Sequence, residues 1–188
     1  LGKEMIRTPV DDAIGYIKKT VIGDVMNIKK VRVDKEGTGM GWGAVYAQYL
    51  ESMDQIGEQG NGLSVSRQLY KGDEALNESA PLKVGDRITV RLTVKADRDM
   101  DFVQIKDDRA ACMEPLQAVS GFRWGNGLGY YQATKDASTQ FFIDQMRKGT
   151  YVIEYQVYVN RTGEYQAGIA TVQSAYAPEF GGHTGGYR

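Results

Sequence analysis

The sequence is short of several residue types, and each shortage argues against a class of protein. Its 188 residues include one cysteine, Cys112, and one histidine, His183. A single cysteine excludes an internal disulfide, and one cysteine with one distant histidine falls short of the three or four ligands of a zinc site. No apolar run approaches the ~20 residues that span a bilayer as a helix. We therefore expect no metal, no cofactor and no membrane-spanning helix.

An excess of positive charge is also missing, because 23 basic residues face 24 acidic ones and the formal net charge is −1. Nucleic-acid binding depends on a basic surface that displaces counterions, so no nucleic-acid partner is expected. The sequence begins at Leu1 rather than at a methionine and shows no signal-peptide pattern. We expect a piece of a longer or processed chain, with any membrane attachment through an anchor outside it.

What the sequence does contain favours strands and tight turns. It has 12 tyrosines, 23 glycines and only four prolines. Residues 88–94 alternate strictly, with Ile88, Val90, Leu92 and Val94 on one face. Residues 151–160 alternate in the same way, and "RTGE" follows as a turn with Gly163 suited to positive φ. Residues 151–160 and 164–177 are therefore predicted to form a hairpin.

Other segments have the same period. Residues 63–70 alternate, and Phe141, Ile143 and Gln145 are predicted to share a face before a turn at "RKG". In the first third, residues 13–21, 27–33 and 42–50 are predicted strands. Helical periodicity is missing, so the fold class is all-β, an antiparallel β-sandwich. The polar, glycine-rich stretch 57–62 indicates a boundary, which assigns residues 1–60 to strands and a linker from a preceding domain and residues 61–188 to the sandwich.

The motifs that resemble catalytic or ligand sites each have a plainer interpretation. Residues 125–129 and 37–43 are rich in glycine but lack the spacing of a dinucleotide or phosphate loop, so we expect loops. Asp107, Asp108 and Arg109, with Glu114 nearby, are expected to be solvated or paired with a neighbouring arginine. His183 lies among four glycines, which cannot hold a general base rigidly, and is expected in a mobile tail. Cys112 lies in an apolar stretch and is expected to be a buried thiol. No catalytic residue and no enzyme activity are expected.

Tyrosines are concentrated in the C-terminal half of the chain, and this allows two interpretations. They are Tyr130, Tyr131, Tyr151, Tyr155, Tyr158, Tyr165 and Tyr176. Aromatic rows bind sugars or peptides, but they are also ordinary cross-strand pairs of a sandwich. A cell-surface carbohydrate- or peptide-binding module is therefore the alternative to a purely structural role.

The run from "GLGYYQATKDASTQFF" through "YVIEYQVYVNRTGEY" to "AYAPEFGG" resembles the C-terminal domain of bacterial alpha-2-macroglobulin family proteins, in versions from Bacteroides-like bacteria. The segments "GWGAVYAQYLESMDQI" and "RITVRLTVKADRDMDFVQIKDD" add to the resemblance, which covers residues 40–188 well. It implies a macroglobulin-like sandwich from a large protease inhibitor of the cell envelope, periplasmic or surface-exposed. The Cys-x-x-Gln thioester motif of that family does not occur here, since Cys112 is followed by "MEP".

The resemblance also implies partners and contact residues. The last domain of such inhibitors packs against the thioester domain of the same parent chain and helps shield the thioester from water. The parent in turn traps host or competitor proteases through a conformational change. In several relatives a methionine precedes the tyrosine of the last motif, where this sequence has Ala175 and Tyr176. The implied domain-interface residues are Tyr176, Ala175, Glu179 and Phe180, with Tyr176 the foremost.

Overall fold

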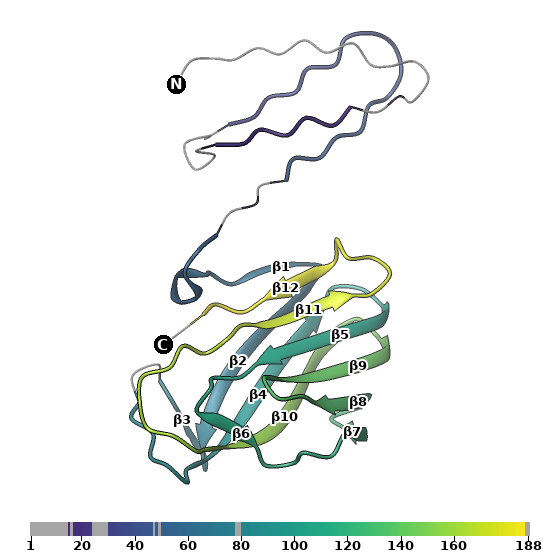
Figure 1. Cartoon of the computed structure of the whole chain (residues 1–188). Coiled ribbons are helices and arrows are strands. Elements are labelled where there is room, and N and C mark those ends of the chain that lie inside the picture. Colours follow the sequence, from purple (N-terminus) through teal and green to yellow (C-terminus); the bar gives the residue numbers. More distant parts are fainter. Residues whose placement is uncertain are drawn as a thin grey trace. The chain divides into compact units, whose positions relative to one another are not determined.

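The computed structural model describes residues 15, 17–23, 30–46, 48, 50–77 and 80–186, with only the backbone for Asp54 (Figure 1). The chain divides into two compact units, Leu1–Leu50 and Glu51–Arg188. Within the described ranges, all regular elements lie in the second unit. They are η2 (Met53–Gln55), β1 (Gln59–Asn61), β2 (Leu63–Lys71), β3 (Glu74–Ala75), β4 (Arg87–Ala96), β5 (Met100–Asp108), β6 (Met113–Pro115), β7 (Gly121–Gly125), β8 (Leu128–Thr134), β9 (Ser138–Met146), β10 (Gly149–Val159), β11 (Ala170–Ser174) and β12 (Gly181–His183).

The first unit does not contain the strands expected there, as far as its described residues go. Residues 17–23, 30–46, 48 and 50 form no strand, so the expected strand over 42–50 is wrong at those positions. Ala47, Tyr49 and parts of the expected strands 13–21 and 27–33 lie outside the described residues. The pattern of apolar residues was compatible with strands, but a strand also needs a partner for its N–H and C=O groups. The assignment of residues 1–60 to a preceding domain stays a prediction.

The second unit is an antiparallel β-sandwich, as predicted. Neighbouring strands follow the order β6-β10-β4-β2-β1-β12-β11-β5-β9-β8-β7, and β3 pairs with β2. This hydrogen-bonded path folds back on itself, so that β6, β10, β4 and β2 form one layer and β11, β5, β9, β8 and β7 form the other. β1 and β12 join the two layers. Figure 1 shows that the strands of the two layers run in clearly different directions.

The core lies between the two layers and consists of the inward-facing residues of each strand. On β4, Ile88, Leu92 and Val94 are fully buried, which confirms the alternation read from the sequence. Facing side chains from the other layer include Ile105, Phe141 and Ile143. Burying such apolar area provides most of the favourable free energy of folding.

The predicted hairpin of residues 151–160 and 164–177 is wrong. β10 pairs with β4 over ten positions and with β6, whereas β11 pairs with β5 and β12. The connection between β10 and β11 therefore passes from one layer to the other, and Gly163 bends it at φ 141°. Alternation identifies a strand with one buried face, but it carries no information about which strand lies alongside.

In the paired strands β5 and β9, the alternation of buried and exposed side chains shifts by one residue at neighbouring positions. Val103 and Ile105 of β5 are buried, but so is Met100, three positions before Val103. On β9, Ile143 is buried and so is Met146, so Met146 takes the inward position that was predicted for the exposed Gln145. Phe102 has φ 52°, in the left-handed region that non-glycine residues rarely adopt. This conformation lets β5 change phase without losing its register with β9.

The C-terminal segment is a strand rather than the mobile tail expected from its glycines. Gly181–His183 forms β12, which pairs with β1 on one side and β11 on the other. The Ala170 N–H donates to the hydroxyl of buried Thr184 at 3.0 Å, and the Gly186 N–H donates to the Ile56 carbonyl at 3.1 Å. Small residues are required here, because a Cβ on Gly182 would lie 2.7 Å from two backbone oxygens. The glycines in this segment allow neighbouring strands to approach its backbone closely. A run of glycines is also typical of a mobile tail, and the sequence alone did not distinguish the two.

Candidate interaction surface

Tyr176 lies on the loop between β11 and β12. Among the described aromatic residues of the second unit it is the most exposed, at 81%. Its ring packs edge-to-face on Phe102, with the ring centroids 5.1 Å apart and an interplanar angle of 84°. The Ala175 N–H donates to the Phe102 carbonyl at 2.9 Å and fixes the loop against β5. The unusual backbone of Phe102 thus turns an aromatic ring outward, where it supports Tyr176.

The other three predicted contact residues share this loop but do different things. Phe180 packs against the main core, and the Arg98 guanidinium lies 4.8 Å from the centre of its ring. Glu179 is exposed, and its carbonyl accepts a 2.7 Å hydrogen bond from the Asn61 side chain. Ala175 is exposed. The structure therefore brings the four residues together in one loop, with Phe180 as its anchor and Tyr176 as its projecting group.

The loop owes its shape to local turn chemistry. The Phe180 N–H donates to the Ala177 carbonyl at 2.9 Å, which closes a four-residue turn with Pro178 in its second position, where the fixed φ of proline is favourable. The Ser174 N–H then donates to the Phe180 carbonyl at 3.0 Å as the chain returns. Pro178 thus helps to reverse the chain between β11 and β12.

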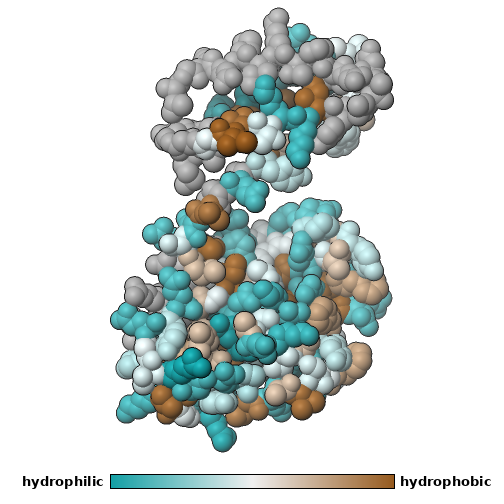
Figure 2. All heavy atoms as spheres, in the orientation of Figure 1, coloured by the Kyte–Doolittle hydropathy of each residue, from teal (hydrophilic) through white to brown (hydrophobic). Residues whose placement is uncertain are grey.

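A second group of exposed aromatic residues lies on the outer face of the same layer, and it was not predicted from the sequence. Phe122 of β7, Tyr131 of β8 and Phe142 of β9 are cross-strand neighbours in one row, with Trp124 two residues along β7. Their exposed fractions are 78%, 37%, 40% and 79% in that order. The alternation of "GFRWG" was the signal that could have revealed them. Figure 2 shows that hydrophobic and hydrophilic residues are interspersed on the visible face of the sandwich.

The geometry of this row bears on the two interpretations of the aromatic residues. Phe122 and Tyr131 meet edge-to-face, with centroids 5.2 Å apart and an interplanar angle of 77°. A sugar ring stacks on a flat aromatic face, whereas edge-to-face pairs are usual in packed protein contacts. The Phe122–Tyr131 pair is therefore accounted for as an ordinary cross-strand contact between aromatic residues.

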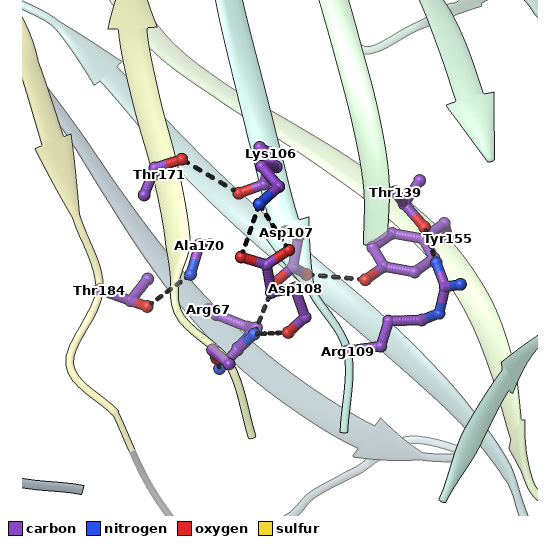
Figure 3. Close-up of polar contacts among 11 residues, drawn as sticks. Arg67, Lys106, Asp107, Asp108, Arg109, Thr139, Tyr155, Ala170, Thr171 and Thr184 are labelled. Carbon is purple, nitrogen blue, oxygen red and sulfur yellow. Dashed lines mark hydrogen bonds and ion pairs between the residues drawn. The ribbon is translucent and has the colours of Figure 1, made fainter. Parts of the chain in front are cut away.

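The charged cluster at Asp107 is internal rather than solvated. Asp107 is 1% exposed, forms a 2.5 Å ion pair with Arg67 of β2 and accepts a 2.7 Å hydrogen bond from the Tyr155 hydroxyl of β10 (Figure 3). Arg67 also donates to the Gly168 carbonyl. The cluster connects the two layers of the sandwich. Burial raises the pKa of Asp107, which the charge of Arg67 and the Tyr155 hydroxyl only partly offset.

The neighbouring charges have structural partners. Lys106 pairs with Asp108 at 2.9 Å, and Arg109 donates to the Thr139 hydroxyl and to the carbonyls of Lys135 and Asp136. Asn160 donates to Glu114 at 3.2 Å. The expectation of pairing with an arginine is met for Asp107, although Arg67 is 40 residues away in sequence rather than adjacent.

The single thiol and the single imidazole are also placed by the structure. Cys112 is buried with Ala110 and Ala167 in a small secondary cluster, and burial raises the pKa of its thiol. His183 is half-buried in β12, with Nδ1 3.1 Å from the Thr184 carbonyl. In the described part of the chain, no three His, Cys, Asp or Glu side chains gather closely enough to hold a metal ion. The same residues include no helix that is long and apolar enough to cross a membrane.

These features define an antiparallel β-sandwich domain whose most exposed aromatic side chains, Tyr176, Trp124 and Phe122, lie on one layer or on its loops. Residues 62–179 match the sequence model of the bacterial alpha-2-macroglobulin MG10 domain. The chain belongs to this family, which confirms the resemblance read from the sequence.

Solved structures share the fold. The sandwich is similar to Salmonella alpha-2-macroglobulin reacted with methylamine, with a TM-score of 0.59 and 20% identity over 70% of this chain and 9% of that one. It is also similar to trypsin-activated alpha-2-macroglobulin from Escherichia coli, with a TM-score of 0.60 and 15% identity over 71% of this chain and 10% of that one. Identities this low show the fold alone.

A curated relative comes from a eukaryote. The chain is 27% identical over 163 residues to Circularly permutated Ras protein 2 of Dictyostelium discoideum. The match covers 83% of this chain and 4% of that protein. The chain thus spans a small fraction of the length of each relative described here.

Proposed function

We propose that this domain is a non-catalytic part of a bacterial alpha-2-macroglobulin-like protease inhibitor, and that it packs against the thioester domain and helps to shield the thioester from water. The observation that carries the proposal is Tyr176, which is 81% exposed and yet supported by Phe102. An aromatic ring left in water on a well-supported loop suits a contact with another domain.

Shielding a thioester requires exclusion of water rather than acid–base chemistry. A ring held by a rigid sandwich covers a reactive bond at little entropic cost, because few rotamers are lost on contact. The loop is fixed at both ends, by the Ala175 N–H on Phe102 and by Phe180 in the core. No titrating group is needed for such a role.

The wider function follows from the proposed parent. Its other domains, the thioester domain among them, are the direct partners of this one, and proteases are bound by the parent as a whole. The domain supports the conformational change that traps the protease. The parent lies in the bacterial cell envelope, periplasmic or surface-exposed, with any membrane anchor outside this chain.

The test is Tyr176→Ala in the full-length protein that carries this domain. We expect methylamine to consume the thioester roughly tenfold faster, which corresponds to about 1.4 kcal/mol of lost protection. The measurement is thiol release as a function of time after methylamine is added.

Tyr158→Ala is the matched control, because Tyr158 is exposed on β10 of the other layer, at 37%. This control should leave the rate unchanged. Equal rates for wild type and Tyr176→Ala would remove the shielding role.

A further inference from the structure

β7 is the edge strand of its layer, and among the described residues no strand pairs with its outer edge. In the described structure it pairs with β8 alone. The β7–β8 hairpin turns through Asn126 and Gly127, both at positive φ, 52° and 76°, as in a two-residue hairpin turn. In that geometry Gly125 and Leu128 bond to each other, so Phe122 and Trp124 direct their N–H and C=O groups away from β8.

The other layer is bounded in part by β6, which pairs with Val157–Val159 of β10. β6 is three residues long and ends at Pro115, which has no N–H to offer. Short strands and prolines are common protections of sheet edges. β7 has five residues, no proline, and two aromatic side chains that are each more than three-quarters exposed. An edge of this kind is suited to pairing with another strand.

A polar cleft of about 350 Å³ lies beside β7, and Arg123 is among its lining residues. Gln117, Gln132, Gln156 and Tyr130 also line it. Glu154 is the acidic lining residue, and it is already paired with Arg91 at 2.6 Å. Arg123 reaches only carbonyl and amide oxygens, at 3.4–3.5 Å, and forms no ion pair with any described carboxylate. Such distances are long for hydrogen bonds, so the guanidinium of Arg123 is able to donate to a better-placed acceptor.

We propose that the free edge of β7 binds an extended acidic peptide segment, which adds to the layer as a further strand. Its backbone pairs with Phe122 and Trp124. One Glu or Asp side chain enters the cleft beside Arg123, and the apolar side chains on either side of it cover Phe122 and Trp124 on the outer face. The alternation of a strand supplies this pattern, because successive side chains point to opposite faces.

Charge selects this occupant over a second copy of the chain. Two β7 edges paired with each other would bring Arg123 of each copy into the same region, and like charges across a strand pair are destabilising. A carboxylate forms a charge-assisted hydrogen bond with the guanidinium instead. The proposal concerns a surface other than Tyr176, so it stands or falls independently of the shielding role.

The probe is the capped peptide KTTVEVTTK, added to the chain with Trp42→Phe so that Trp124 is the remaining tryptophan. We expect a saturable blue shift of Trp124 emission below about 1 mM peptide, since covering the ring removes it from water. Arg123→Gln should weaken binding about tenfold, and Arg123→Glu should bind KTTVKVTTK in preference to the acidic peptide.

Two controls keep the outcome specific. Arg161→Gln removes an exposed arginine from a loop and should leave the affinity unchanged. A peptide with N-methyl groups on alternate amides along its pairing edge should not bind, because it cannot donate to the backbone of β7. An absence of saturable binding up to about 1 mM, or equal affinity in folded Arg123→Gln, would overturn the proposal.

Discussion

Tyr155 carries its hydroxyl into the interior of the sandwich, where it donates to Asp107, which in turn pairs with Arg67. A buried charge of this kind is tolerated only when it is paired and hydrogen-bonded. Burial raises the pKa of Tyr155 well above its ordinary value, and the negative charge of Asp107 raises it further. The phenol therefore stays protonated in the folded protein under conditions that ionise a tyrosine in water.

The raised pKa of Tyr155 predicts an alkaline loss of stability. Above about pH 10 the unfolded chain releases the phenolic proton while the folded chain keeps it, so the free energy of unfolding falls as pH rises toward the pKa of the folded state. The loss from this group is at most about 1.4 kcal/mol per pH unit. Tyr155→Phe should show a shallower decline between pH 9 and 11, measured by urea unfolding.

Tyr158→Phe provides the comparison on the same strand, because Tyr158 is exposed to solvent. Its stability should fall with pH in parallel with wild type. A parallel decline in Tyr155→Phe as well would show that the buried phenol is not responsible for the loss.

At the scale of elements, β12 joins the two layers, and its glycines make this possible. β1 and β12 lie between β2 of one layer and β11 of the other, so the strand order is continuous from β6 to β7. Gly182 lies where the backbones of three strands approach, with the Gln59 and Leu63 carbonyls 2.7 Å from the position of a Cβ. Backbone atoms cannot move aside as the end of a flexible side chain can.

Gly182→Ala should therefore destabilise the domain by about 1–3 kcal/mol, the range of overpacking substitutions. The measurement is the midpoint of thermal unfolding. Gly57→Ala is the matched control, since a Cβ there meets nothing within 4 Å and its φ is not positive. A midpoint for Gly182→Ala equal to that of the control would mean that β12 is not held as tightly as the structure indicates.

At the scale of the whole molecule, the second unit contains a complete core. The buried apolar residues run from Leu63 to Val172, and all lie between Glu51 and Arg188. A unit with its own core is in principle able to fold without the rest of the chain. The described residues of Leu1–Leu50 add none to the core cluster.

A chain beginning at Glu51 should therefore unfold with a single cooperative transition. Its free energy of unfolding should lie within about 0.5 kcal/mol of the complete chain, as for changes away from a core. Denaturant unfolding followed by circular dichroism measures this. Loss of the cooperative transition would show that the first fifty residues are part of the folding unit.

Predictions from the sequence succeeded where a property is local to one strand. The inward faces of β4 and β10 were predicted by alternation, because the side-chain period of a strand is set by its own backbone. The four contact candidates were taken from one short motif, and the structure shows them in one loop. The aromatic row of Phe122, Tyr131 and Phe142 was not found, since its members come from three strands and meet only through their register.

The sequence by itself determined the all-β class, the membership of the alpha-2-macroglobulin family and the inward faces of β4 and β10. Only the tertiary structure decided that β10 and β11 are not neighbours, that the glycine-rich C-terminus is a paired strand, and that Asp107 meets Arg67 and Tyr155 inside the core. The physical reason is common to all three. Strand partners and buried ion pairs depend on contacts between residues distant in sequence, and several arrangements satisfy the same local pattern of apolar and polar residues.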